Sequence, residues 1–266
     1  NRKSFIGGIF TATNRNLQGD ELNYLRKSAY TAGFDFMHNW KNRKYYFSGN
    51  IVTSHVTGSK EAIANTQQEL THLFQRVDAG HVEVDPNRTS LTGTGGKFEL
   101  GKNSVGNWRY YGIFTWRSPE LELNDVGFLR QADDLRQIGI LSYQTLKPIG
   151  NFRRINARFE QFTSYDFDGN HNRTQYSISS NANFKSNWSI YYQFTHKPKI
   201  FTNTILQGGP RFRYSEEVIN VLNFSTDSRK KLRFDSGIVA SQGKDNSFSY
   251  TEFTTGITYQ PINAFT

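Results

Sequence analysis

The sequence predicts an all-β protein: an antiparallel, up-and-down transmembrane β-barrel with about twelve strands in this chain and one short loop helix near residues 59–74. Three observations predict this fold. Phe, Tyr and Trp make up 15% of the 266 residues, a composition typical of strands. Apolar and polar residues alternate strictly over long runs. These runs span roughly 9–13 residues, which matches a tilted strand that crosses a bilayer.

The clearest alternation lies between residues 30 and 40. One set of alternate positions is mostly aromatic or small, and consists of Tyr30, Ala32, Phe34, Phe36, His38 and Trp40. The intervening set is Thr31, Gly33, Asp35, Met37 and Asn39. Successive side chains of a strand point to opposite faces, so this pattern predicts one apolar face and one polar face. The same split recurs at 174–184 and 188–195.

Alternating runs separated by turn residues define the predicted strands. Lys147–Asn151 and Asp166–Asn170 are examples of the turns, with Pro, Gly, Asn and Asp at their centres. Most connections are short enough to join only neighbouring strands, which predicts a meander. The predicted strand windows are 4–14, 28–40, 44–56, 89–100, 106–117, 134–146, 152–165, 173–184, 188–197, 210–224, 230–242 and 247–260.

One segment has helical rather than strand periodicity. Ser59–Phe74 carries Ile63, Thr66, Leu70 and Phe74 at helical spacing, and Ser59 is a suitable N-cap. We therefore expect a short helix inside a long loop. Folded into a barrel lumen, it would act as a plug.

Soluble β-sandwiches and barrels also alternate, but they bury an apolar face rich in Val, Leu and Ile. Here the apolar face is mainly Phe, Tyr and small residues, whereas the other face is mainly amides, hydroxyls and charges. This favours a membrane barrel with a wet lumen. The residues predicted to face the lumen and to set any selectivity are Thr31, Asp35, Asn156, Arg158, Asn181 and Asn183.

Several chemistries are excluded or disfavoured by composition and motifs. The chain has no cysteine, which excludes disulfides and thiolate metal sites. It has no apolar run long enough for a transmembrane helix, no recognisable signal peptide, no HExxH motif and no P-loop. We expect no cofactor and no metal site. The net charge of +9 includes basic turns at 41–44 and 229–231, for which anionic lipid and lipopolysaccharide are better partners than nucleic acid.

The acidic segment after residue 117 is the main candidate site. Its predicted binding residues are Arg117, Glu120, Glu122, Asn124 and Asp125. Paired carboxylates can catalyse glycoside hydrolysis across a cleft, but a folded loop that caps Arg117, Arg130 or Arg136 is the better interpretation. We assign no catalytic residue. Asp166, Asp168 and Asn170 have the alternate spacing of a calcium loop, although a hairpin turn explains them better.

Several sequence blocks resemble a known family. They are FQRVD (74–78), TSLTGTGGKFELGK (89–102), RSPELELNDVGFLRQADD (117–134) and LQGGPRF (206–212). From about Phe10 to Pro261 the chain resembles an uncharacterised family of Bacteroidota outer-membrane β-barrels. In that family the barrel follows an N-terminal module similar to family-nine carbohydrate-binding modules.

The resemblance implies location and architecture more strongly than activity. We expect residues 1–266 to be a single barrel domain in the outer membrane of a Gram-negative cell. The domain is expected to be incomplete at one or both ends, because the chain begins inside a predicted strand and residues 264–266 do not resemble a closing strand.

The expected function is non-enzymatic: a pore, a transport component or a scaffold. The alternative is a carbohydrate-binding protein that assists polysaccharide uptake or breakdown, and a soluble β-rich enzyme is a third, disfavoured interpretation. The expected partners are lipid and lipopolysaccharide, with glycans and other outer-membrane proteins as further candidates.

Overall fold

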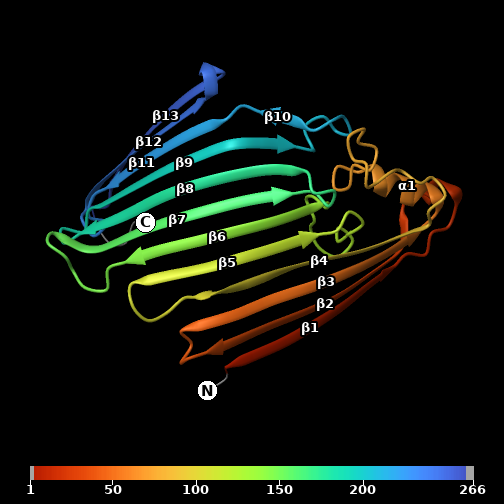
Figure 1. Cartoon of the computed structure of the whole chain (residues 1–266), viewed down its shortest axis with the longest axis horizontal. Helices are drawn as coiled ribbons and strands as arrows, with labels where there is room; N and C mark the ends of the chain where they lie inside the picture. The colour runs from red at the N-terminus through yellow and green to blue at the C-terminus, as the bar shows by residue number, and fades with distance from the viewer. Residues whose placement is uncertain (1–2, 262–266) are drawn as a thin grey trace.

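A computed structural model describes residues 3–261 and contains a single antiparallel sheet. Figure 1 shows the strands lying side by side in one curved sheet, with each strand beside its neighbour in sequence. The strands of the meander are β1 (Ser4–Asn14), β2 (Arg26–Trp40), β3 (Tyr45–Gly58), β4 (Ser90–Lys102), β5 (Trp108–Arg117), β6 (Asp134–Gln144), β7 (Phe152–Tyr165), β8 (His171–Phe184), β9 (Ser189–Thr202), β11 (Glu217–Ser225), β12 (Leu232–Gly243) and β13 (Ser249–Tyr259).

The prediction of an all-β antiparallel meander is confirmed, with one correction to the strand count. The predicted strand 210–224 is two strands, β10 (Phe212–Tyr214) and β11, and both pair with β9. Pairing of β11 with β9 ends at Lys197, and pairing of β10 begins at Ile200. Pro198 lies between these positions and has no N–H to donate, which explains why the ladder is interrupted there. The sheet therefore has thirteen strands.

The sheet is open over the described residues. Among residues 3–261, β1 pairs only with β2 and β13 pairs only with β12, so no ladder closes the predicted barrel. Both edge strands are exposed along nearly their whole length. The predicted absence of a closing strand at 264–266 concerns residues outside the described part of the chain.

Strand register separates two faces that run across the whole sheet. Side chains directly opposite each other in a ladder share a face. The apolar face includes, in strand order, Phe34, Ile51, Phe114, Leu141, Phe159, Ile178, Tyr192, Leu222 and Phe253. The polar face carries the intervening residues, among them Thr31, Ser54, Arg158, Ser179 and Gln193.

The two ends of the sheet differ in the lengths of their connections. At one end, here called the short-turn end, the connections are residues 41–44, 103–107, 145–151, 185–188 and 226–231. At the other, the long-loop end, they include residues 15–25, 59–89, 118–133 and 203–211. Figure 1 shows helix α1 and the longest connections gathered at this second end.

Helix α1 (Lys60–Gln68) is shorter than the predicted 59–74. Ser59 is its N-cap as predicted, because its Oγ accepts a hydrogen bond of 3.0 Å from the Ala62 amide. The helix ends at Gln68 because the chain turns back on itself: Leu73 has a φ of 54°, and the Phe74 amide donates to the Gln67 carbonyl at 2.9 Å. Leu70, predicted on the apolar helix face, is 54% exposed.

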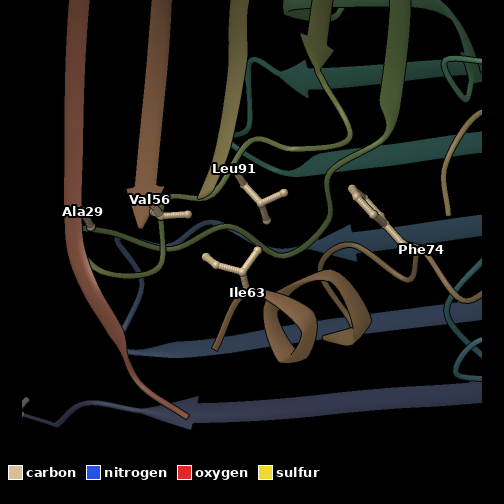
Figure 2. Close-up of a cluster of buried hydrophobic side chains, with 5 residues drawn as sticks. All are labelled: Ala29, Val56, Ile63, Phe74 and Leu91. Atoms are coloured by element: carbon tan, nitrogen blue, oxygen red, sulfur yellow. The ribbon is translucent and has the colours of Figure 1, made fainter. Parts of the chain in front are cut away.

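The turn brings Phe74 back into a small hydrophobic core. Figure 2 shows Ile63 of α1 and Phe74 facing Ala29, Val56 and Leu91, which lie on the polar face of β2, β3 and β4. The helix therefore packs on the polar face of the sheet, at its long-loop end. Within residues 3–261, no helix is long and apolar enough to cross a membrane.

Aromatic side chains gather on the apolar face at the short-turn end. Trp40 stacks on Tyr45 across β2 and β3, with ring centroids 5.9 Å apart, and Trp108 contacts Tyr143 across β5 and β6 at 5.1 Å. Only one residue of an aromatic doublet can take this position, because its neighbour points to the opposite face. Tyr46 accordingly faces the polar side.

Candidate functional site

The long-loop end holds two loops folded onto the polar face: residues 59–89, which include α1, and residues 118–133. Loop 118–133 lies directly on β4 at two glycines. A Cβ at Gly93 would lie 2.2 Å from the Leu121 amide nitrogen, and one at Gly95 would lie 2.6 Å from the Leu121 side chain. The loop can reach the sheet only because these two positions carry no side chain.

Loop 118–133 has a small hydrophobic core of its own. Leu121, Leu129 and Ala132 are buried together, and Val52 of β3 packs against them. Burying apolar surface is the main favourable contribution to the docking of such a segment. The acidic string is therefore part of a folded layer on the sheet.

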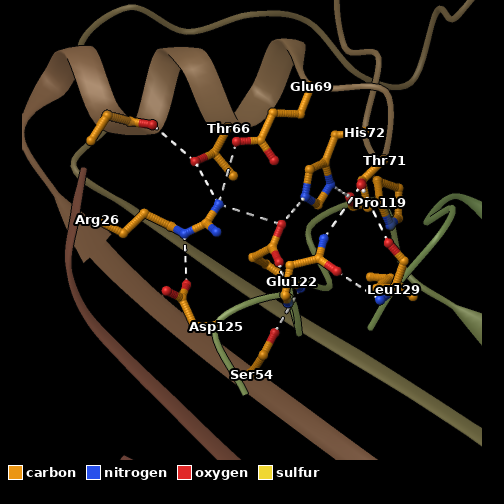
Figure 3. Close-up of polar contacts among 12 residues, drawn as sticks. Arg26, Ser54, Thr66, Glu69, Thr71, His72, Pro119, Glu122, Asp125 and Leu129 are labelled. Carbon is orange, nitrogen blue, oxygen red and sulfur yellow. Dashed lines mark hydrogen bonds and ion pairs between the residues drawn. The ribbon is translucent and has the colours of Figure 1, made fainter. Parts of the chain in front are cut away.

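Arg26, at the start of β2, joins the two loops (Figure 3). Its Nε lies 2.7 Å from Asp125 Oδ2, and its Nη1 lies 3.2 Å from Thr66 Oγ1 of α1. The same Nη1 is 3.5 Å from Glu69 and 3.6 Å from Glu122. One guanidinium thus contacts α1, the residue after it and two acidic residues of loop 118–133, Glu122 and Asp125.

Glu122 is the most enclosed carboxylate of this cluster. Its side chain is fully buried, and its Oε2 lies 2.9 Å from His72 Nε2. Its own amide donates to Ser54 Oγ on β3 at 3.0 Å. The other ring nitrogen of His72 lies 2.7 Å from the Pro119 carbonyl oxygen, which can only accept. His72 therefore ties loop 59–89 to loop 118–133 through both of its ring nitrogens.

The two glutamates near Arg26 have opposite pKa shifts. Burial alone would raise the pKa of Glu122, but hydrogen bonds from His72 and the Asn124 amide, together with Arg26, outweigh burial and lower it. For Glu69, burial is the dominant effect and raises the pKa, despite the attraction of Arg26. The ionised form is thus favoured at Glu122 and disfavoured at Glu69.

A second cluster, around Asp133, extends the contacts across the long-loop end. Asp133 lies 2.9 Å from His81 and 3.3 Å from Arg76, and it accepts a hydrogen bond of 2.9 Å from the Phe167 amide in the β7–β8 turn. Farther on, Asp78 of loop 59–89 accepts a hydrogen bond of 2.8 Å from the Arg211 amide, between β9 and β10. Loop 59–89 consequently spans the long-loop end from β3 to β9.

The predicted binding residues Arg117, Glu120, Glu122, Asn124 and Asp125 contact several partners, and two of these residues share the same arginine. Glu122 and Asp125 meet at Arg26, and Asp125 also lies 2.5 Å from Arg15. Asn124 closes the loop internally, since its Oδ1 accepts from the Leu129 amide at 2.7 Å. The remaining two, Glu120 and Arg117, lie 4.0 Å from Arg88 and 3.7 Å from Asp134, respectively.

This arrangement is typical of polar contacts that stabilise the packing of two loops on a sheet. Glu122 is engaged by cations on loop 59–89 and on β2, so Glu120 and Glu122 do not form a free acid–base pair. Of the arginines proposed as partners of the acidic string, Arg117 and Arg136 contact Asp134. The other acidic residues pair with arginines and histidines from distant segments instead.

All the residues predicted to face the lumen lie on the polar face. Asn156 is directly opposite Asn181 in the β7–β8 ladder, Arg158 is opposite Ser179, and Asn183 donates to Asn181 at 2.7 Å. Thr31 and Asp35 on β2 lie on the same face, because the ladders from β2 to β7 carry it across the sheet. The binding role of these residues stays a prediction.

Sequence reasoning missed the cations of the main cluster. Arg15, Arg26 and His72 are 110, 96 and 50 positions from their partners Asp125, Glu122 and Glu122 (125 − 15, 122 − 26 and 122 − 72). No local spacing connects them. The only sequence signal was an excess of acidic residues in a segment with too few cations of its own.

The segment with calcium-like spacing is a hairpin turn between β7 and β8. Asp166 is fully buried and accepts hydrogen bonds from the Asn170 amide at 2.8 Å and the Asn170 side chain at 3.1 Å. Gly169 has a φ of 79°, which glycine adopts readily. Within the described residues, no group of three or more His, Asp or Glu side chains is placed to hold a metal ion.

Comparisons with known proteins place the chain in a family. No curated protein matches its sequence. Several solved structures resemble it at low similarity. The anion-selective porin from Comamonas acidovorans is 10% identical, with a TM-score of 0.36 over 97% of this chain and 95% of that chain. The Acinetobacter baumannii protein OccAB3 is 9% identical, with a TM-score of 0.32 over 96% and 86%. The family model described as a domain of unknown function, DUF5916, matches residues 10–266, and the chain therefore belongs to this family.

Proposed function

We propose that this chain forms the membrane-spanning wall of an outer-membrane β-barrel that acts, without catalysis, as a pore or transport component. The observation that carries the proposal is the apolar face. Large hydrophobic side chains are exposed on it from one side of the sheet to the other, for example Phe34 (46%), Ile178 (55%) and Phe253 (75%). In water such a continuous patch favours aggregation, whereas a bilayer accommodates it.

The opposite face and the strand lengths support the same location. The strands of the meander range from 9 residues in β11 to 15 in β2, long enough to cross the hydrocarbon core at a tilt. The polar face of β7 and β8 carries Arg158, Asn156 and Asn181, which suit contact with water. Lys41 and Lys44 lie over the Tyr45 ring at the short-turn end, where phosphate headgroups would meet them.

The asymmetry of the connections supports one orientation. Bacterial outer-membrane barrels have short periplasmic turns and longer extracellular loops. By this rule the short-turn end faces the periplasm, and loops 59–89 and 118–133 face the outside of a Gram-negative cell. We infer that these two loops narrow the outer mouth of the barrel.

The two loops cover only one part of the polar face. The loops pack on β2, β3 and β4, through Ala29, Val56, Leu91 and Gly93. The rows on β7 and β8 farther toward the short-turn end, such as Asn181 and Asn183, are not part of either loop core. A constricted pore accounts for this arrangement better than a sealed scaffold.

Glycan transport is a second candidate, favoured by one observation. Tyr191 and Gln193 on β9 share the polar face with Asn181 and Asn183 on β8, so that an aromatic ring stands among amides. The resemblance to Bacteroidota barrels that follow a carbohydrate-binding-like module suggests the same solutes. Block of single-channel current by oligosaccharides, lost in Tyr191→Ala and kept in Tyr192→Ala on the apolar face, would distinguish a glycan pore from a general one.

Single-channel recording in a planar bilayer tests the pore itself. We expect discrete conductance steps from the protein, and larger steps from Glu122→Gln, which weakens the contact between the two loops. Arg229→Gln is the control, because Arg229 contacts Asp227 in a short turn away from the loops. Steps that appear only in the loop variant would identify a plugged barrel. The absence of steps in both proteins, after insertion is verified, would contradict the pore function.

A further inference from the structure

A large cavity on the polar face lies beyond the two loop cores. It has a volume of about 890 Å³, and it opens between the long-loop ends of β5 to β9 and the segment after β9. Leu70 of loop 59–89 reaches its edge. This volume falls within the range of small-molecule sites in proteins, about 300–1,000 Å³.

The cavity has an unbalanced charge. Its lining contains four arginines, Arg117, Arg130, Arg136 and Arg173, and one acidic residue, Asp134. The formal balance of these groups is +3 (4 − 1). Asp134 contacts two of these arginines, with its Oδ2 2.5 Å from Arg136 Nε and 3.7 Å from Arg117 Nη1. Its single negative charge is therefore shared between two guanidinium groups.

Other arginines of the same sheet differ from these. Arg158, farther along the polar face, has Glu160 at 2.7 Å, and Arg26 has Asp125 at 2.7 Å with two glutamates nearby. The cavity lining differs from these two sites, because it contains four arginines and a single carboxylate.

Two polar groups of the cavity lack partners within the described part of the chain. Arg173 uses Nη2 to donate to Gln175 at 2.5 Å, but its buried Nε has no acceptor. Asn203 is only 6% exposed, and its side-chain oxygen has no hydrogen-bond donor. Of these two groups, the Arg173 Nε is a donor and is therefore available to an oxygen of an anionic ligand.

The rest of the lining indicates what kind of anion would fit. Phe162, Phe201, Ile200 and Tyr214 line the cavity together with the arginines. Arg173 lies over the Phe162 ring at 5.5 Å. An inorganic ion would leave this apolar surface without a contact, whereas an organic anion would cover it.

We propose that this cavity binds a small organic anion, with its carboxylate or phosphate group held by Arg173, Arg130 and the Arg117–Arg136 pair. The inference deepens the proposed function and rests on it in one respect: the bound anion would be the solute that the barrel admits. Arginine is suited to both groups because its planar fork can donate two hydrogen bonds to one oxyanion.

Calorimetric titration of the detergent-solubilised protein tests the site without requiring a pore. The probes are benzoate, phenyl phosphate, inorganic phosphate and benzyl alcohol. We expect one or both aromatic anions to bind, and the stronger of the two identifies the head group as carboxylate or phosphate. Binding of benzyl alcohol with equal strength, or tighter binding of inorganic phosphate, would overturn the organic-anion assignment.

Three single variants locate the site. Arg173→Gln, and separately Arg130→Gln at an exposed position of loop 118–133, should each weaken binding about tenfold or more, as expected for loss of a charged hydrogen bond. Arg154→Gln is the matched control on the same polar face, nearer the short-turn end, and should bind as the unmodified protein does. Arg130→Gln keeps the test valid if Arg173→Gln fails to fold, since Arg130 is exposed. Equal loss in Arg154→Gln would overturn the site.

The two proposals can fail separately. Anion binding by a protein that gives no conductance steps would leave the site standing and remove the pore. Conductance steps without binding of any anionic probe would leave the pore standing and remove the site.

Discussion

The covered part of the polar face, on β2 to β4, and its uncovered part, on β7 and β8, are built from strands with the same alternation but different polar-face residues. The covered part presents small side chains, such as Ala29, Ser54 and Gly93, and the loops lie directly on them. The uncovered part presents long polar ones, such as Arg158 and Asn181. Small polar-face residues at positions 54 and 93 therefore allow loop 118–133 to lie directly on the sheet.

The largest effect is expected from a side chain placed under loop 118–133, because it would remove the close contact between this loop and the sheet. Gly93→Ala would put a Cβ 2.2 Å from the Leu121 amide nitrogen, a backbone atom that cannot move alone. We expect the loop to undock at a cost of about 2–3 kcal/mol, the upper part of the range for overpacking. Limited proteolysis within 118–133 would detect the undocked loop.

A matched glycine on the other face serves as the control for Gly93→Ala. Gly112 lies on the apolar face of β5, and a Cβ there would approach nothing closer than 4.0 Å. Gly112→Ala should leave the proteolysis rate unchanged. Equal sensitivity of the two variants would show that strand glycine content, and not loop docking, matters.

Two carboxylates, one in the covered part and one in the uncovered part, allow their contributions to the free energy of unfolding to be compared. Glu122→Gln removes the charge that Arg26 and His72 surround in the covered part, and we expect it to destabilise the loops by about 3 kcal/mol. Glu160→Gln removes the partner of Arg158 in the uncovered part, where both side chains are about a third exposed, and should cost less than about 1 kcal/mol. Urea unfolding in lipid vesicles measures both. A larger loss in Glu160→Gln would reverse the comparison.

These contrasts show what the sequence could predict. The strands were predictable because alternation is local: the windows 4–14 and 152–165 coincide with β1 and β7. Ser59 was predictable as an N-cap for the same reason. The end of α1 was not, because it depends on Phe74 packing against Val56 and Leu91. The Arg26–Glu122–His72 cluster joins three distant segments, and no spacing within one segment could indicate it.

The stability of the docked loops should also depend on pH, with a smaller effect than that of the variants above. The ionisation of Glu122 should determine this dependence. Its folded pKa lies below its ordinary value of 4.5, so its ionisation stabilises the docked loops above that pH. That stability is lost as the pH falls below about 4.5 toward the folded pKa. Glu69 has a raised pKa and acts in the opposite direction, since its contribution is lost as the pH rises through the folded value.

Proteolysis of loop 118–133 at a series of pH values checks this expectation with an acid-tolerant protease. Cleavage should become faster below about pH 4.5, and Glu122→Gln should be cleaved readily at every pH. Glu69→Gln should keep the acid-induced increase. Faster cleavage on raising the pH, with Glu122 intact, would mean that Glu69 dominates.

The smallest perturbation is the introduction of a single cysteine, whose labelling can be compared between positions. The chain has no cysteine of its own, so each introduced thiol is unique. Ser54→Cys lies under loop 118–133 and is 1% exposed, whereas Ser179→Cys lies on the uncovered polar face of β8. In vesicles, a membrane-impermeant maleimide should label Ser179→Cys and spare Ser54→Cys. Ile178→Cys, one residue away on the apolar face, should also escape labelling by this maleimide. In a second measurement, a fluorophore is attached to the cysteine at position 178 before reconstitution. A quencher dissolved in the lipid should then reduce its fluorescence.

Combining Ser54→Cys with Glu122→Gln connects the two parts of the comparison. If the Arg26–Glu122–His72 cluster holds the loop on the sheet, weakening it should make the thiol at position 54 reactive without changing the labelling of Ser179→Cys. A position 54 that stays protected would mean that the apolar core of Leu121, Leu129 and Ala132 holds the loop by itself. The charged cluster would then orient a loop that hydrophobic burial already docks, and small polar-face residues alone would define the covered part.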